Sequence, residues 1–159
     1  IDFWDDVYGF DYSCIKEIAL RESLVDTVEL RSVVCDPAPL MHLDLMTVKK
    51  EDLSFKNPFR LLVTRNDYVH AFLGWFDIGF EACHKPVRFS TGPHSRYTHW
   101  KQTVFYTPGN LTVSQGDVIE GTLSCMPNAR NNRDLDISIT YKLEGANPAE
   151  GSMDYKMYV

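Results

Sequence analysis

The sequence predicts a mainly β fold, a β-barrel or barrel-like sandwich, preceded by a short helical segment. The clearest observation is the alternation of apolar and polar residues from Leu135 to Leu143, as expected for a strand with one buried face. Turn-forming residues recur at 108–110, 115–117 and 128–132, a spacing typical of strands in a sandwich or barrel. The chain length suffices for one domain, which we place at residues 1–159.

Residues 11–34 have a different, helical pattern. Ser13 is a candidate helix cap, and apolar residues follow at helical spacing before Ser23 restarts the pattern. The prolines within 36–39 then end the helical part, because proline cannot continue a helix. We therefore expect two short amphipathic helices, whose apolar side chains are Ile15, Ile18, Leu24, Val25 and Val28.

From residue 40 onward the pattern predicts short strands separated by turns. The almost continuously apolar stretch from Tyr68 to Phe80 is too long for one flat strand, and we expect it to bend at Gly74 and Gly79. A turn is expected around Asn57-Pro58. Further strands are expected at 41–48, 59–64, 101–106, 117–126 and 153–159.

The formal net charge of −6 narrows the classes of partner. Direct binding to nucleic acid is not expected, because phosphate contacts need clustered lysine and arginine side chains. A basic partner is favoured instead, since long-range attraction would draw it to an acidic protein. No apolar run approaches the roughly 18 residues of a membrane span, so we expect no membrane association. Because the chain begins without methionine and in aromatic-rich sequence, we interpret it as part of a longer protein.

The sequence offers few residues for metal or covalent chemistry. The four cysteines have no CxxC spacing, and we expect free, mostly buried thiols in a reducing compartment, with disulfides as the alternative. Cys83 and His84 are adjacent and would point to opposite faces of a strand, so we expect no metal site. A Cys–His nucleophile pair stays open, although no cysteine has the strand-to-helix context that would expose it. No glycine-rich loop is placed to hold a phosphate or a nucleotide cofactor.

The segment 90–106, STGPHSRYTHWKQTVFY, carries the candidate functional residues. Its loop ends by placing Thr98, His99 and Trp100 at the mouth of a strand. A histidine there can hydrogen-bond through both ring nitrogens and titrates near neutral pH, and a tryptophan provides a flat wall for a cationic or extended group. The alternative is structural: His99 would cap a backbone group and Trp100 would fill one end of the barrel. The pattern alone leaves both interpretations open.

Three segments carry a resemblance to a known family: FWDDVYGFDYS (3–13), FSTGPHSRYTHWKQTVFY (89–106) and NNRDLDISITY (131–141). They resemble the C-terminal half of type I protein arginine N-methyltransferases, with similar spacing from about Phe3 to Gly145. The resemblance implies a barrel with a dimerisation arm at about 11–34, which would carry the apolar helix residues named above. The Rossmann-like domain that holds S-adenosylmethionine and two substrate-gripping glutamates in this family is absent from the sequence.

The resemblance also implies roles for individual residues. His99 would be catalytic, pairing with an aspartate of the missing domain, and Thr98 and Trp100 would wall the substrate pocket. Tyr8 and Tyr12 would contact the substrate, and Phe10 would contact the cofactor. These roles need both halves of the enzyme, so we expect the chain alone to be inactive and to bind no S-adenosylmethionine.

For the complete protein, the resemblance implies a homodimer that converts arginine to monomethyl and asymmetric dimethyl products. Its expected partners are arginine- and glycine-rich proteins, histone tails and its own cofactor domain, and its expected location is the nucleus and the cytoplasm. One alternative is a non-catalytic interaction module that recruits arginine-rich proteins or self-associates. Another is a barrel that holds a ligand in a pocket of its own, which the many large aromatic side chains disfavour.

Overall fold

The computed structural model describes residues 2–158, and most of its regular structure is β. The helical elements are short: η1 (Asp2–Asp5), η2 (Ser13–Ile15), α1 (Lys16–Leu20), η3 (Leu30–Ser32) and η4 (Lys50–Leu53). The strands are β1 (Leu24–Asp26), β2 (Phe55–Leu62), β3 (Asp67–Gly74), β4 (Asp77–Phe80), β5 (Val87–Ser90), β6 (Gln102–Val113), β7 (Val118–Pro127), β8 (Leu135–Glu144) and β9 (Ala149–Met157). The predicted mainly β fold is confirmed.

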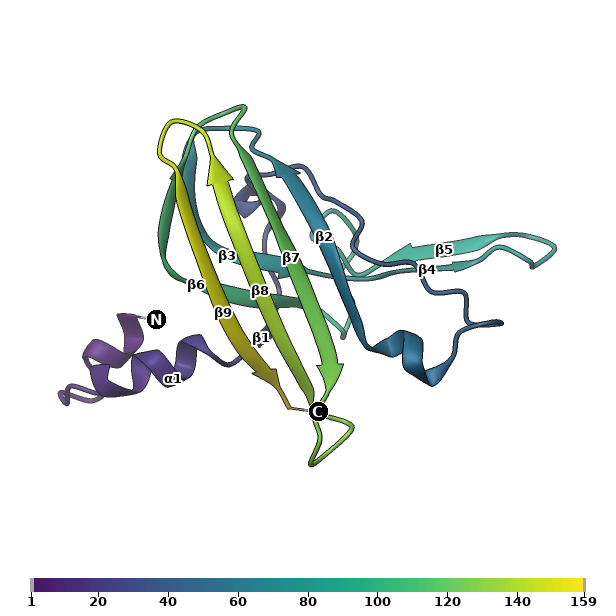
Figure 1. Cartoon of the computed structure of the whole chain (residues 1–159), viewed down its shortest axis with the longest axis horizontal. Coiled ribbons are helices and arrows are strands. Elements are labelled where there is room, and N and C mark those ends of the chain that lie inside the picture. The colour runs from purple at the N-terminus through teal and green to yellow at the C-terminus, as the bar shows by residue number, and fades with distance from the viewer. Residues whose placement is uncertain (1, 159) are drawn as a thin grey trace.

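The strands form two main sheets and a projecting hairpin (Figure 1). One sheet has the antiparallel order β2-β7-β8-β9, and the other has the order β1-β6-β3. The hairpin β4–β5 extends from one side of the molecule, and the N-terminal segment with α1 extends from the opposite side. The architecture is therefore the barrel-like sandwich form of the prediction.

The core lies between the two sheets. Ile137, Ile139, Tyr141 and Leu143 of β8 are buried, as the predicted alternation requires. Tyr155 of β9 is also buried, and its hydroxyl donates a hydrogen bond of 2.7 Å to the carbonyl oxygen of Tyr106 in β6. This bond joins β9, an edge strand of one sheet, to β6, the central strand of the other.

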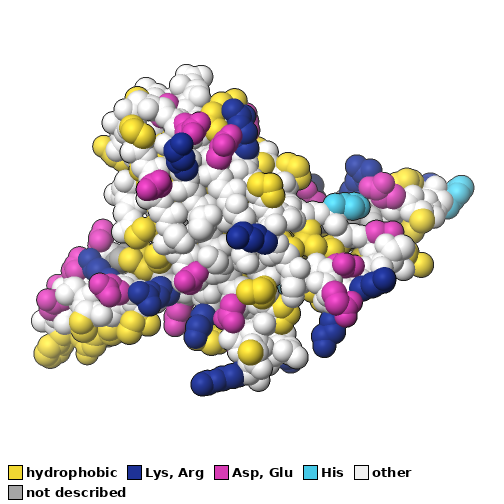
Figure 2. Space-filling view, viewed as in Figure 1, with side chains coloured by type: hydrophobic (Ala, Val, Ile, Leu, Met, Phe, Trp, Pro, Cys, Tyr) yellow, Lys and Arg dark blue, Asp and Glu magenta, His cyan; other side chains and the backbone are white. Residues whose placement is uncertain are grey.

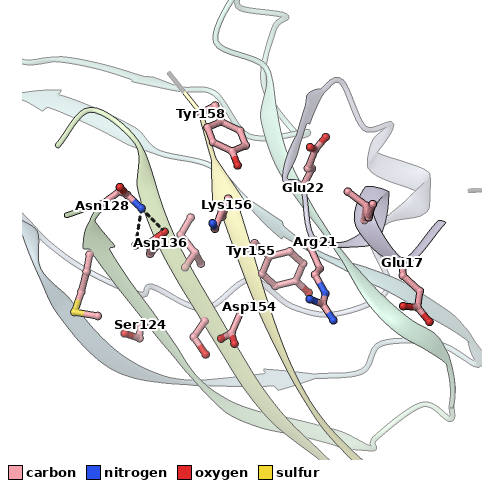
Figure 3. A pocket seen from close by; sticks show the side chains of 14 residues that line it. Glu17, Arg21, Glu22, Ser124, Asn128, Asp136, Asp154, Tyr155, Lys156 and Tyr158 are labelled. Atoms are coloured by element: carbon pink, nitrogen blue, oxygen red, sulfur yellow. Dashed lines mark hydrogen bonds between the residues drawn. The ribbon is translucent and has the colours of Figure 1, made fainter. Parts of the chain in front are cut away.

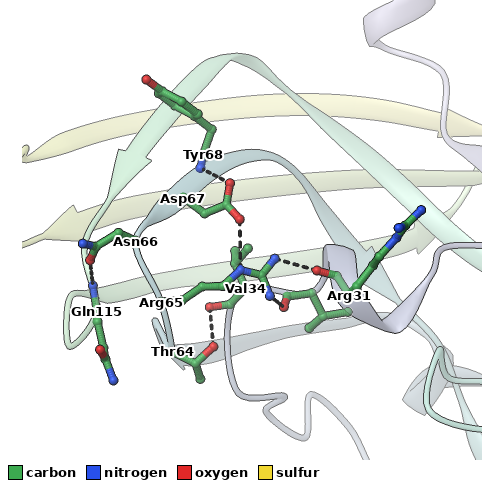
Figure 4. Close-up of polar contacts among 9 residues, drawn as sticks. Arg31, Val34, Thr64, Arg65, Asn66, Asp67, Tyr68 and Gln115 are labelled. Carbon is green, nitrogen blue, oxygen red and sulfur yellow. Dashed lines mark hydrogen bonds and ion pairs between the residues drawn. The ribbon is translucent and has the colours of Figure 1, made fainter.

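The segment 22–35 closes the barrel between the sheets. Glu22 pairs with Lys156 of β9, β1 pairs with β6, and Cys35 pairs with Val63. Arg65 holds the same segment, because its guanidinium donates to the carbonyl oxygens of Val33 at 2.9 Å and Arg31 at 2.6 Å (Figure 4).

The second predicted helix is wrong. Leu24 and Val25 lie in β1, where they pair with Val104 and Thr103 of β6. Pairing with a sheet edge outweighs the weak helical propensity of so short a segment. The part of the chain that projects is therefore residues 2–20, with α1 as its one α-helix, and the predicted arm at about 11–34 includes β1 and η3 as well as α1.

Two local predictions also fail. The alternating stretch at 41–48 forms no strand, and a hydrogen-bonded turn occupies 44–48 instead. Asn57 and Pro58 lie within β2 rather than in a turn, because β2 is an edge strand and tolerates a residue without an N–H.

The predicted bend at Gly74 is confirmed, since β3 ends there, whereas Gly79 lies inside β4.

Residues 2–158 contain no helix with the length and apolarity that a membrane crossing requires. Within the same range, no group of three or more histidine, cysteine, aspartate or glutamate side chains is arranged to hold a metal ion.

Candidate functional site

The predicted site residues Thr98, His99 and Trp100 lie in a tight turn just before β6. The N–H of Lys101 donates to the carbonyl oxygen of Thr98 at 3.1 Å and closes the turn. Lys101 itself has a φ of 54°, a left-handed conformation that a non-glycine residue adopts only where the surroundings enforce it. The strand begins one residue later than predicted, at Gln102.

Gln102, the first residue of β6, holds the turn in place, and no sequence pattern singles it out. Its side chain is buried, donates to the carbonyl oxygen of Thr91 at 2.5 Å and accepts from the N–H of Val28 at 2.8 Å. Since a buried amide is costly unless it is paired, both bonds stabilise this geometry. Gln102 thus ties together three segments that are distant in the sequence.

Trp100 rests on an aromatic base at the root of the hairpin. Its ring stacks on Phe89 at 5.8 Å, with an angle of 21° between the planes, and meets Phe76 edge-on at the same distance. Trp100 remains 47% exposed, so one part of the ring is available as a wall. The imidazole of His99 lies against this ring, with 4.0 Å between the centroids, and is itself exposed.

The loop that precedes the turn is closely packed. Thr91 is buried, and its hydroxyl donates to the carbonyl oxygen of Phe76 at 3.0 Å. A Cβ at Gly92 would lie 2.7 Å from the ring of His94 and 2.8 Å from the indole nitrogen of Trp75, so a larger residue requires these side chains to shift. Packed neighbours therefore support the turn.

The hydroxyl of Thr98 is buried and has no hydrogen-bond partner within residues 2–158. Buried hydroxyls are normally paired, so an unpaired one at this position is unusual.

Tyr8, Phe10 and Tyr12 are not brought to this turn. They lie in the N-terminal segment, on the side of the molecule opposite the hairpin (Figure 1). Tyr8 is 97% exposed in a turn with Gly9, where both residues have positive φ, and Phe10 is also exposed. Phe10 lines neither of the two hollows described below.

The N-terminal segment presents apolar side chains to solvent. Figure 2 shows them gathered along one edge of this segment, where Phe3, Phe10 and Ile18 are exposed. Ile18 of α1 is 62% exposed and Ile15 is half-buried. Leu24 and Val25, predicted for the same surface, lie in β1 and are partly exposed there, and Val28 hydrogen-bonds to Gln102. The exposed apolar side chains of residues 2–20 therefore do not form one helical face with Leu24, Val25 and Val28.

Two hollows lie on the surface of the protein. A groove of about 670 Å³ separates α1 from β7, β8 and β9, and Figure 3 shows Arg21, Asp154 and Lys156 around it. A smaller hollow of about 410 Å³ lies beside Pro58 and Glu120. Neither includes the turn at 98–100.

All four cysteines are free. Cys14 and Cys83 are exposed, so the prediction of mostly buried thiols is wrong for half of them. Burial raises the pKa of Cys35 to about 11, and burial also raises the pKa of Cys125. These two thiols are poor nucleophiles at neutral pH, because the thiolate is the reactive form.

Asp26 links the turn to β1. Its carboxylate accepts from the N–H of Thr27 and from Nζ of Lys101, at 2.8 and 3.1 Å. Both interactions favour the ionised form and lower the pKa of this carboxyl, the backbone bond more than the lysine.

A family model described as the arginine methyltransferase oligomerization subdomain matches residues 1–146. The chain belongs to this family. The resemblance found in the sequence is therefore confirmed, and the subdomain includes both the N-terminal segment and the turn at 98–100.

Curated relatives extend the match to the C-terminus. The chain is 55% identical to protein arginine N-methyltransferase 1 of Schizosaccharomyces pombe and 51% identical to that of Saccharomyces cerevisiae. These alignments cover 99% and 91% of the chain, but 47% and 42% of the relatives. The chain thus spans about half the length of the curated relatives it matches.

Solved structures give the same result. This protein matches a chain of the Trypanosoma brucei PRMT1 enzyme-prozyme heterotetrameric complex with AdoHcy, with a TM-score of 0.92 and 41% identity. The match covers 99% of this protein and 50% of that chain. A match to Arabidopsis thaliana protein arginine methyltransferase 10 has a TM-score of 0.82 and 18% identity, covers 98% of this protein and 50% of that chain, and supports the fold alone.

Proposed function

We propose that this chain is the C-terminal half of a protein arginine N-methyltransferase, in which the turn at 98–100 forms one wall of the substrate pocket. The observation that carries the proposal is the exposed imidazole of His99, held against Trp100 on a rigid aromatic base. Catalysis of methyl transfer depends on positioning and on charge neutralisation, and a fixed turn supplies positioning.

In the proposed reaction, a guanidinium nitrogen bonds to the methyl carbon of S-adenosylmethionine as the sulfur–carbon bond breaks. The bonding pair stays on sulfur, which leaves S-adenosylhomocysteine, and the nitrogen's proton passes to solvent through the pair of His99 and a carboxylate of the cofactor half. His99 orients the guanidinium through a carboxylate of the cofactor half. Phe10 is proposed to contact the cofactor, and Tyr8 and Tyr12 the substrate, once that domain is present.

The finer features of the complete protein are part of the same proposal. Its substrates are arginine- and glycine-rich proteins and histone tails, whose positive charge suits a chain of net charge −6. Its products are monomethyl and asymmetric dimethyl arginine, and its location is the nucleus and the cytoplasm. It is proposed to be a homodimer in which residues 2–20 dock on the partner subunit.

The test is substitution of His99 in the full-length enzyme. His99→Ala is expected to lower methyl transfer to an arginine–glycine peptide by roughly 100-fold or more, the usual range for an acid–base or orienting histidine. His84→Ala is the matched control, because His84 is exposed in the turn of the β4–β5 hairpin, away from the site. A His99→Ala rate within twofold of the parent enzyme would falsify the proposed role.

A second candidate is an interaction module, favoured by the exposed apolar side chains of residues 2–20. Soluble proteins rarely leave such surfaces uncovered, and Ile18 is a clear example at 62% exposure. For a module that only recruits or self-associates, Ile18→Asp would abolish association while His99→Ala would change nothing. For the enzyme, His99→Ala would remove turnover while the dimer remains intact.

A further inference from the structure

The edge of the last strand is hydrogen-bonded to the base of the N-terminal segment. The N–H of Lys156 donates to the carbonyl oxygen of Arg21 at 3.0 Å, and the N–H of Ser23 approaches the carbonyl oxygen of Lys156 at 3.5 Å. Glu22 lies opposite Lys156 in a parallel bridge. Because β9 is an edge strand of its sheet, residues 21–23 add a short backbone pairing to that edge.

Beyond this contact, α1 still lies near β6, but the hydrogen bonds that the structure describes for residues 2–20 no longer reach the barrel. Within the described chain, the hydrogen bonds of residues 2–20 join them to one another or to residues 21 and 22. The groove under α1 separates Glu17 and Ile18 from Asp154 and Tyr158 of the last strand and its end (Figure 3). The Lys156 contact is thus the last backbone attachment before the segment projects.

The next attachment along the chain is β1, which pairs with β6 from Leu24 onward. Without the Lys156 bonds, the first backbone attachment of the segment would be Leu24 instead of Arg21, with three more residues unpaired, and the segment would depend on the packing of α1 near β6. A longer free connection allows more orientations, and each must be restricted again when the segment docks.

We propose that Lys156, at the end of β9, positions the projecting segment and so promotes assembly of the subunits. The inference rests on the proposed function, in which residues 2–20 dock on a partner subunit. It goes beyond the matched family range, because the family model covers residues 1–146 and β9 spans Ala149–Met157. Lys156 acts here through its backbone, as a positioning residue.

Lys156→Pro is the selective variant. Successive N–H groups of a strand point to opposite sides, so the Lys156 N–H that reaches Arg21 makes no bond to β8. Proline removes this donor without removing a bond of the β8–β9 ladder, and edge strands tolerate proline. Asp154→Pro is the matched control, because Asp154 faces the same side two residues earlier. Lys156→Ala separates the loss of the side chain from the loss of the N–H.

Two exposed native thiols can report the direction of the segment. Cys14 lies in η2 of the projecting segment and Cys83 lies in the turn of the β4–β5 hairpin. Spin labels are attached to both cysteines in the full-length enzyme, whose other accessible cysteines are replaced by serine. Labelled subunits are diluted with unlabelled ones, so that the measured distance distribution is that between Cys14 and Cys83 of one subunit. The dimer dissociation constant is measured separately on unlabelled protein by sedimentation.

Lys156→Pro is expected to broaden the Cys14–Cys83 distribution and to raise the dimer dissociation constant about fivefold, the equivalent of one lost hydrogen bond. Asp154→Pro and Lys156→Ala are expected to match the parent protein. An unchanged distribution in Lys156→Pro would overturn the positioning inference. A broadened distribution with an unchanged dissociation constant would overturn the link to assembly.

The variant Ile18→Asp distinguishes a failure of the Lys156 inference from a failure of the proposed function. If Ile18→Asp also leaves the dimer intact, residues 2–20 are not the docking element, and the assembly part of the proposed function is wrong. If Ile18→Asp dissociates the dimer while Lys156→Pro does not, the docking role stands and the link between Lys156 and assembly is rejected.

Discussion

Trp100 stacks on Phe89 with 5.8 Å between their ring centroids and 21° between their planes. Phe89 belongs to β5, so the projecting hairpin supports the turn that carries His99. An aromatic pair of this kind contributes about 0.5–1.5 kcal/mol beyond its buried area. The orientation of His99 therefore depends on a hairpin that precedes it in the chain.

Phe89→Ala is expected to lower the turnover of the full-length enzyme about tenfold, because Trp100 and His99 lose their fixed base. The melting temperature is expected to fall by only a few degrees, since Phe89 is half-buried. Phe80→Ala on the same hairpin is the control, as Phe80 is exposed and is expected to change neither quantity. Equal turnover in the two variants would contradict this account.

Gly92→Ala is expected to reduce the free energy of unfolding by about 1–3 kcal/mol, because the added methyl group overlaps the rings of His94 and Trp75. Gly109→Ala provides the comparison, since a Cβ at Gly109 meets nothing within 4 Å. Urea titration followed by circular dichroism measures both. The idea fails if the two substitutions have the same cost.

Stability is expected to fall at alkaline pH through Tyr155. Burial raises the pKa of this phenol above its ordinary value of 10.0, and the neighbouring Tyr141 adds to the effect. Since the folded state holds the proton more tightly, the contribution to stability is complete below pH 10. It is lost as the pH rises above 10 towards the folded pKa, by up to about 1.4 kcal/mol per pH unit.

Tyr155→Phe tests this sign. The variant lacks the hydrogen bond to Tyr106 and is expected to be about 1 kcal/mol less stable at pH 8. Between pH 10 and pH 11 it is expected to lose less stability than the parent. Three other groups have raised pKa values and lower the alkaline stability of both proteins alike: Cys35, Cys125 and Tyr141. Parallel pH profiles for the two proteins would show that Tyr155 is not responsible.

Removal of two buried hydroxyls is expected to change the free energy of unfolding differently. Ser23 has a buried hydroxyl without a partner in the described chain, so Ser23→Ala should leave stability unchanged or raise it by up to about 1 kcal/mol. The Thr91 hydroxyl bonds to Phe76, so Thr91→Val should cost about 1–2 kcal/mol. Chemical unfolding of both variants decides the matter, and a destabilised Ser23→Ala would indicate a partner for that hydroxyl.

Patterns within single strands were readable from the sequence. The alternation of β8 gave its buried face correctly, and the bend at Gly74 was found because an apolar stretch was too long for one strand. The turn at 98–100 was identified from its composition and its resemblance to a family. In each case the information lies within a few neighbouring residues.

Other features depended on partners far along the chain. Leu24 and Val25 have the pattern of a helix but pair with β6, and Gln102 gave no signal although it joins three segments. Pro58 suggested a turn because the sequence does not reveal which strand lies at an edge.

The sequence by itself determined the fold class, the family and the turn that carries His99, because these follow from local periodicity and from short motifs. The tertiary structure decided where residues 2–20 leave the barrel, which rings support Trp100 and what holds Arg21 to Lys156. The physical reason is that strand pairing and aromatic packing are made between distant residues, and their free energy exceeds the small local preferences that a sequence pattern reports.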